Sequence, residues 1–113
     1  MRMWNVDPGL MCRRHLLGEH VEMHMFVGAI RKGMPIKGYV ERGLVETGNI
    51  GKRHDELAGE MEERGYAHNS PLADFSCESD GFVDVEKNLE ELRSRCPECR
   101  ERIEHYERRE RCK

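Results

Sequence analysis

The first part of the chain carries an apolar stripe with helical spacing. Apolar side chains recur at steps of three, four or seven between residues 12 and 30, which places them on one face of an α-helix. Asp7 and Pro8 suit the N-cap and the first helical position, and Gly33 with Pro35 should end the helix. Glu19 interrupts the stripe where a core residue is due. The predicted long N-terminal helix has an apolar face made of Cys12, Leu16, Met23, Val27 and Ile30.

Two further helical patterns follow a glycine-rich stretch, residues 33–51, which we interpret as a loop with at most a short helical turn. Residues 52–66 form the second pattern, and Gly65 is its expected stop. The third runs from Val85 to Tyr106, and Pro97 inside it predicts a kink or two abutting helices. We therefore expect an all-α, compact single domain over residues 1–113. It should be a bundle of about three helices, with a long N-terminal helix and a kinked C-terminal helix.

Composition and charge narrow the functional classes. No apolar run approaches the roughly 20 residues that cross a bilayer, and the N-terminus lacks the apolar region of a signal peptide. We expect a cytoplasmic protein without a membrane or protein partner. The net charge of −3 hides an asymmetry, because residues 1–54 carry +4 and residues 55–113 carry −7. The basic first half could therefore contact phosphates while the acidic remainder faces away.

Histidine and glutamate residues gather in "HLLGEHVEMH", residues 15–24. His20 and His24 are four residues apart and share a helical face, whereas Glu22 lies roughly 160° around the helix from His24. The stretch is therefore not the HExxH motif of zinc proteases. A metal bound by the two histidines would need a third ligand, for which His54 and His68 are candidates. The other interpretation is that the histidines line a core edge or a polar groove.

The cysteines raise a second metal question. "CPECRERIEHYERRERC" has the Cys-x₂-Cys spacing of zinc ligands. Cys96 and Cys99 also continue the apolar stripe, however, where free cysteine acts as a small hydrophobic residue. Two interpretations of these cysteines therefore remain, buried thiols and a structural zinc site. We expect no other cofactor. The zinc candidates are Cys96, Cys99, His105 and Cys112.

Three segments together resemble a known family. The opening "MRMWNV", the stretch "RRHLLGEHVEMHMFVGAIRKG" (residues 13–33) and "RHDELAGEMEERGY" (53–66) are similar, in order and spacing, to pyrimidine-dimer DNA glycosylases of the phage endonuclease V type. "HNSPL" at 68–72 also resembles the cellular members. The resemblance covers residues 1–72, and residues 73–113 then form an acidic, cysteine-containing helical extension.

The resemblance implies a catalytic pair. In this family the free α-amine of the N-terminus is the nucleophile and a glutamate on the first long helix assists it, which by position implies Met1 and Glu22. An α-amine titrates at about 7.7–8.0, so an appreciable fraction is neutral at physiological pH. Methionine is normally removed only before small residues, so Arg2 should keep Met1 in place. The chemistry requires no metal.

The resemblance also implies contacts with damaged double-stranded DNA. Arg31 and Lys32 are two of the residues implied in these contacts, and they also have a simpler interpretation. Their positive charges compensate the dipole at the end of the helix, which is worth a few tenths of a kcal/mol. The phage member carries arginines where this chain has Val21 and Met25, on either side of the glutamate. The implied DNA-contacting residues are Arg2, His15, Arg31 and Lys32.

The sequence therefore predicts a DNA repair enzyme, a DNA glycosylase with abasic-site lyase activity on pyrimidine dimers or related lesions. The alternative is a non-catalytic helical protein that keeps the same scaffold and binds nucleic acid or zinc. Loss of the two arginines beside the glutamate keeps that alternative open.

Overall fold

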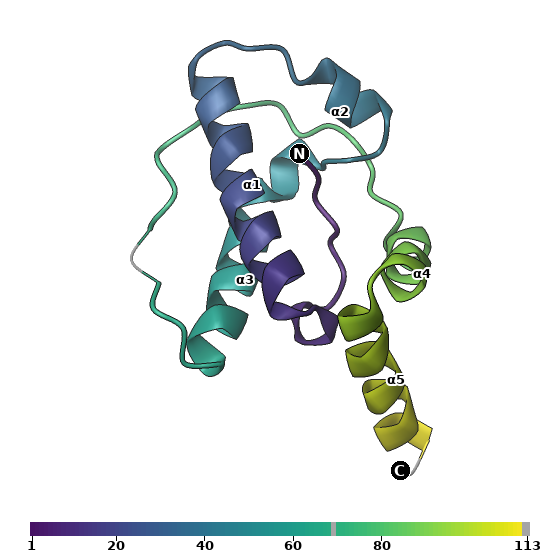
Figure 1. Cartoon of the computed structure of the whole chain (residues 1–113). Coiled ribbons are helices and arrows are strands. Elements are labelled where there is room, and N and C mark those ends of the chain that lie inside the picture. Colours follow the sequence, from purple (N-terminus) through teal and green to yellow (C-terminus); the bar gives the residue numbers. More distant parts are fainter. Residues whose placement is uncertain (69, 112–113) are drawn as a thin grey trace.

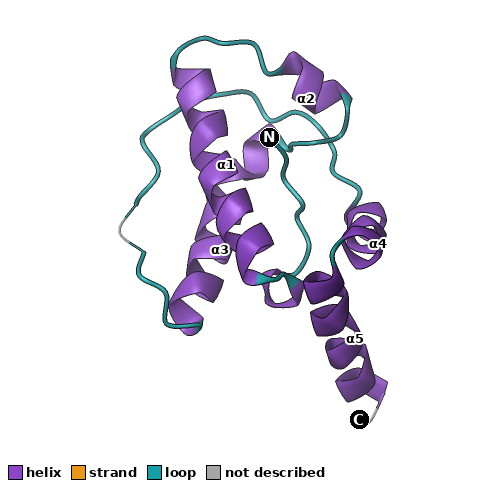
Figure 2. Ribbon diagram, viewed as in Figure 1, coloured by secondary structure: helices purple, strands orange, loops and turns teal. Residues whose placement is uncertain are grey.

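Helices form all the regular structure of residues 1–68 and 70–111, the residues that the computed structural model describes (Figure 2). None of the helices in these ranges is both long and apolar enough to span a membrane. The predicted all-α class is confirmed. In chain order the elements are the 3-10 helix η1 (Pro8–Leu10), α1 (Arg13–Arg31), α2 (Lys37–Glu41), the 3-10 helix η2 (Thr47–Asn49), α3 (Ile50–Glu63), α4 (Val85–Arg95) and α5 (Pro97–Arg111).

The long N-terminal helix is present, but it begins later than its predicted cap. Asp7 caps η1, because its side chain accepts a hydrogen bond from the Gly9 amide at 2.9 Å. Met11 is then extended and breaks the helix, and Cys12 caps α1 by accepting from the His15 amide at 3.4 Å. The chain therefore turns between η1 and α1. All members of the predicted apolar stripe are buried except Ile30, which is half-buried.

Two glycines end the first and third α-helices as predicted. Gly33 has a φ of 72°, and the amides of Gly33 and Met34 bond back to the carbonyls of Ile30 and Ala29. Gly65, with a φ of 83°, makes the same pair of bonds after α3. This double bond pattern is the Schellman motif, which needs a left-handed residue and therefore favours glycine.

The core lies where α1 packs across α3, with the N-terminal segment beside them (Figure 1). α2 is the short helical turn expected within residues 33–51. The connection from α3 to α4 passes the end of α1 and η2, where Thr47 Oγ1 donates to the Glu78 carbonyl at 2.6 Å. α4 and α5 abut at Pro97, the first residue of α5, which confirms the predicted break.

A buried ion pair joins α1 to α3. Arg53 of α3 holds Glu19 of α1 with two hydrogen bonds, Nε to Oε2 at 2.6 Å and Nη2 to Oε1 at 2.8 Å. Both residues are 1% exposed. The third guanidinium nitrogen, Nη1, donates to the Val6 carbonyl at 2.7 Å, which ties the N-terminal segment to the same group. The glutamate that interrupts the apolar stripe is therefore the partner of an arginine in the core.

Replacing Glu19 with glutamine should strongly destabilise the fold. The variant leaves the buried Arg53 charge uncompensated, which costs about 3 kcal/mol or more of unfolding free energy. Urea denaturation followed by circular dichroism measures the change. Glu56→Gln is the matched control, because Glu56 reaches the same guanidinium only at 3.8 Å and is 40% exposed. That control should lose less than about 1 kcal/mol. Equal losses for the two variants would contradict the assigned role of Glu19.

Candidate active site

The segment that leads to the N-terminus is held along its backbone. It runs extended beside α1 towards α2 (Figure 1), and Asn5 turns it with a φ of 58°, a left-handed conformation that asparagine tolerates. Three hydrogen bonds hold the segment, and each is made by one of its backbone atoms. The position of the first residue therefore depends little on its own side chain. The bonds are Met3 N to the Leu44 carbonyl (2.7 Å), Asn88 Nδ2 to the Trp4 carbonyl (2.8 Å) and Arg53 Nη1 to the Val6 carbonyl (2.7 Å).

The held segment places the α-amine of Met1 beside Glu22. The amine nitrogen lies 3.9 Å from Glu22 Oε1, and the two side chains are 14% and 29% exposed. A ligand can therefore reach the pair from solvent, while the protein still shields much of it. The two residues implied as catalytic are adjacent in space, although 21 positions separate them in the chain.

Glu22 lies in an environment that favours its neutral form. Burial raises the pKa of the Glu22 carboxyl above its usual value. The positive amine of Met1 opposes this effect, and the negative Glu19 adds to it. A carboxyl group with a raised pKa holds a proton more readily than an ordinary glutamate does.

The four implied DNA-contacting residues lie in different surroundings. Arg2 is already paired, since its guanidinium bonds to Glu91 and to Asn88 Oδ1 of α4 and stacks over the Trp4 ring. Arg31 and Lys32 are exposed at the end of α1, about 13 Å along the helix from Glu22. His15 lies at the other end of α1, among cysteines. Only the pair at the C-terminal end is free to meet a phosphate without breaking a side-chain pair, although Arg31 also donates to the Asp74 carbonyl.

The surface beside Glu22 is apolar. Val21 and Met25 are 56% and 50% exposed, one helical turn apart on α1. Exposed hydrophobic residues therefore stand at the two positions where the phage member has arginines. The Glu22 carboxylate has no cation at either position.

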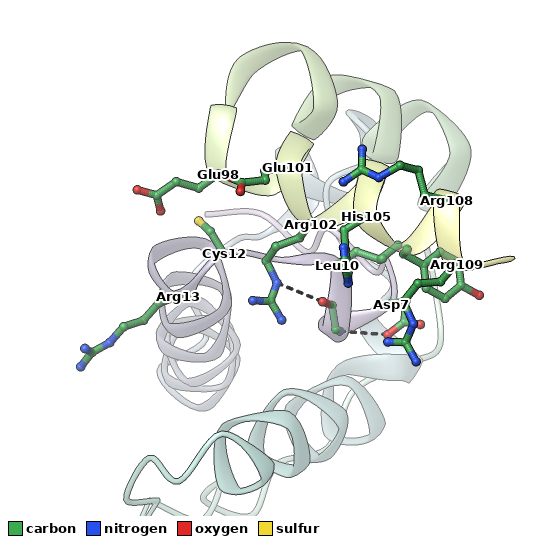
Figure 3. A pocket seen from close by; sticks show the side chains of 12 residues that line it. Asp7, Leu10, Cys12, Arg13, Glu98, Glu101, Arg102, His105, Arg108 and Arg109 are labelled. Atoms are coloured by element: carbon green, nitrogen blue, oxygen red, sulfur yellow. Dashed lines mark hydrogen bonds between the residues drawn. The ribbon is translucent and has the colours of Figure 1, made fainter. Parts of the chain in front are cut away.

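The candidate metal ligands are redistributed by the fold. Cys96 and Cys99 meet two residues of the N-terminal region, Cys12 and His15, and one ligand atom of each lies within 4.8 Å of the other three. His105 is outside this cluster, exposed on α5 over η1, where it lines a pocket that Cys12 also lines (Figure 3). Cys112 lies outside the described residues. The sequence therefore identified two of the four residues, and no motif connected them to Cys12 and His15, more than 80 positions away.

A second set of metal-binding side chains is formed by histidines. Four imidazoles pack at ring distances of 4.7–5.3 Å: His20, His24, His54 and His68. Ligand nitrogens of the first, third and fourth could hold an ion. Hydrogen bonds already use several of these nitrogens, however, because His20 Nε2 bonds to His68 Nε2 at 2.8 Å and His54 Nε2 donates to the Ser70 carbonyl at 3.2 Å. The arrangement supports the interpretation of a polar cluster at the edge of the core.

A comparison with known families bears on the site as a whole. A model of the family described as pyrimidine dimer DNA glycosylase matches residues 1–74. The chain belongs to this family. No curated protein and no solved structure matches it. Membership in the pyrimidine dimer DNA glycosylase family confirms the resemblance inferred over residues 1–72. The matched segment contains both Met1 and Glu22, whereas α4 and α5 lie outside it.

Acid should destabilise the protein through the histidine cluster. Burial, reinforced by the neighbouring imidazoles of His54, His24 and His68, lowers the pKa of His20 from 6.5 to about 4. The folded state therefore binds this proton less readily than the unfolded state. The stability that His20 contributes is complete above pH 6.5 and is lost as the pH falls towards 4, a change of roughly 2 kcal/mol by about pH 4.5.

Urea titrations across this pH range measure the effect on the free energy of unfolding. His20→Gln keeps a nitrogen donor near His68 but has no titrating ring, so its stability should fall less steeply below pH 6.5 than that of the wild type. The exposed His105→Gln variant should keep the wild-type slope. Parallel curves for wild type and His20→Gln would show that this histidine does not carry the acid sensitivity.

Proposed function

We propose that the protein is a DNA repair enzyme, a glycosylase with abasic-site lyase activity that acts on pyrimidine dimers or related lesions in double-stranded DNA. The observation that carries this proposal is the 3.9 Å approach of the Met1 amine to Glu22 in a partly open site. Membership in the pyrimidine dimer DNA glycosylase family supports the class of substrate.

In the proposed reaction the neutral amine attacks C1′ of the damaged nucleotide. The new C–N bond forms as the glycosidic bond breaks, and the base leaves with the bonding electron pair and takes up a proton. Loss of the amine proton and opening of the sugar give an imine between Met1 and C1′. Carboxylate Glu22 stabilises the positive charge that develops on the sugar and accepts the amine proton.

The imine then makes strand cleavage possible. It acidifies the C2′ proton, and removal of that proton expels the 3′ phosphate by β-elimination. Glu22 is the base that contacts the amine. Burial raises the pKa of its carboxyl, which allows it to hold and return protons during these steps. Water finally hydrolyses the imine and frees the amine.

The exposed surface around the pair suits a distorted duplex. Arg31 and Lys32 offer positive charge at one end of α1, where they can position a phosphate backbone. Val21 and Met25 present apolar surface beside Glu22, where side chains of this kind can pack against an unstacked base. Extrusion of the target nucleotide would bring its C1′ to the amine.

A second candidate is a non-catalytic DNA-binding protein on the same scaffold. One observation favours it: no arginine flanks Glu22 on α1, because the exposed apolar residues Val21 and Met25 occupy those positions. This candidate requires DNA binding without covalent chemistry, and the trapping experiment below separates the two.

Borohydride reduction should trap the wild-type protein covalently on DNA that contains an abasic site or a pyrimidine dimer. Glu22→Gln should lower the rate of trapping roughly 100-fold or more, because the amine loses its proton acceptor. Glu41→Gln is the control, since Glu41 is an exposed carboxylate in an unrelated pair with Lys37. Denaturing gel electrophoresis measures the adduct, and intact mass spectrometry identifies the modified residue. Binding without any adduct on either DNA would favour the non-catalytic candidate.

Extending the chain by Gly-Ser before Met1 should abolish trapping and leave the fold intact. The new amine would lie up to about 7 Å from the old position, beyond reach of the carboxylate. Circular dichroism and the urea midpoint check the fold. Full trapping by the extended protein would exclude Met1 as the nucleophile.

A further inference from the structure

Three cysteines and one histidine converge where the start of α1 meets the α4–α5 corner. Cys12 Sγ lies 3.8 Å from Cys96 Sγ and 3.2 Å from His15 Nδ1, and Cys99 Sγ lies 3.6 Å from the same nitrogen. The three cysteines are at most 3% exposed. The side chains come from three places in the chain, so the tertiary fold creates the cluster.

The spacing of these atoms matches a tetrahedral ion. Zinc binds thiolate sulfur at about 2.3 Å and imidazole nitrogen at about 2.1 Å. Tetrahedral angles then place two sulfurs about 3.8 Å apart and a sulfur and a nitrogen about 3.6 Å apart. The Cys12–Cys96 sulfur separation of 3.8 Å and the Cys99–His15 separation of 3.6 Å fall at these values, and the Cys12–His15 separation of 3.2 Å is shorter. A disulfide would instead need sulfurs about 2.05 Å apart.

The backbone around the sulfurs is arranged as for thiolates. The Cys99 amide points at Cys96 Sγ (3.4 Å), the Cys12 amide at Cys99 Sγ (3.2 Å) and the His15 amide at Cys12 Sγ (3.4 Å). Each sulfur therefore receives one backbone N–H, and hydrogen bonds of this kind stabilise negative charge on a ligand. Two of these bonds also cap helices, because Cys12 precedes α1 and Cys96 precedes α5, whereas the bond from the Cys12 amide to Cys99 Sγ joins distant parts of the chain.

The surrounding charge is also suitable. Three thiolates and one Zn²⁺ leave a net charge of −1. The cations Arg14 and Arg95 and the anion Glu98 all act electrostatically on His15, so positive charges outnumber negative ones there. Cys77, by contrast, is exposed and does not belong to the cluster.

We propose that Cys12, His15, Cys96 and Cys99 bind one structural zinc ion, with His15 coordinating through Nδ1. The four protein ligands leave no open position, so the ion takes no part in chemistry on a substrate. This ligand set replaces His105 and Cys112 of the sequence-based set. A His15 that binds zinc through Nδ1 has only Nε2 left for any contact with DNA.

The ion would fasten the C-terminal helices to the catalytic half of the chain. α4 supports the N-terminal segment, since Asn88 holds the Trp4 carbonyl and both Asn88 and Glu91 hold the Arg2 guanidinium. α5 otherwise meets the N-terminal half around η1. Zinc at the corner between the two helices therefore contributes to the position of the amine, and the proposal stands whether or not the protein cleaves DNA.

Metal analysis of the purified full-length protein tests the site directly. Native mass spectrometry should find about one zinc ion per chain. Replacement of zinc by Co²⁺ should produce tetrahedral d–d bands and a thiolate-to-cobalt charge-transfer band, which histidine-only sites lack. Failure of the wild-type protein to bind either ion, or cobalt spectra without thiolate bands, would overturn the proposal.

Variants then identify the ligands. Cys99→Ser and His15→Asn should each lower the zinc affinity at least about tenfold. Their matched controls are Cys77→Ser and His105→Asn, which should bind zinc like the wild type. In both controls the cobalt spectrum should show the same thiolate bands as in the wild type, because neither substitution changes the core. Loss of zinc from the His105→Asn variant, or unchanged affinity in His15→Asn, would refute the proposed ligand set.

Discussion

The buried pair of Glu19 and Arg53 is the interaction on which the rest of the structure depends. It joins the two helices that form the core, and its third contact, with the Val6 carbonyl, adds the N-terminal segment to the same point. Burying two charges costs several kcal/mol of desolvation for each, so the pair adds little net stability over a well-packed apolar pair. Its value is geometric. An apolar contact would tolerate sliding of one helix along the other, whereas a two-point hydrogen-bonded pair permits one register.

The register of α1 against α3 determines where the N-terminal amine of Met1 lies. An α-amine has no side chain to aim it, so its position is set only by the backbone behind it. Between Val6 and Met1 the segment is held at Trp4 and Met3, and few free dihedral angles remain before the amine. Helix α1 provides two carboxylates, three residues apart, that have different roles. Glu19 is fully paired inside the core, while Glu22, at the edge of the core, has only the amine as an ion-pair partner among the described residues.

Local signals in the sequence predicted the elements well and their contacts poorly. Gly33 and Gly65 end helices as expected, because a left-handed residue is a property of the chain at one position. Asp7 was misassigned since an aspartate before proline caps a 3-10 turn as readily as an α-helix.

Contacts between distant residues could not be predicted in the same way. Met1 and Glu22 came from the family resemblance, and their closeness could not be derived from spacing. Arg53 was missed, although the glutamate inside an apolar stripe was a signal that a buried cation must exist. Cys12 and His15 could not be linked to Cys96 and Cys99 because no periodicity reaches across 84 residues.

The C-terminal extension therefore has a structural reason to accompany the family-matched part. Residues beyond 74 supply Asn88 and Glu91, which hold the opening segment, and two cysteines that pack against the start of α1. The acidic character of residues 55–113 has a use at this contact, because Glu91 neutralises Arg2 next to the amine. A positive guanidinium left free there would compete with Met1 for Glu22. Pairing it with α4 leaves the amine as the ion-pair partner of the carboxylate, while the backbone and the charge of Arg2 still act on Glu22 and lower its pKa. One acidic residue of the extension therefore serves the interior of the site.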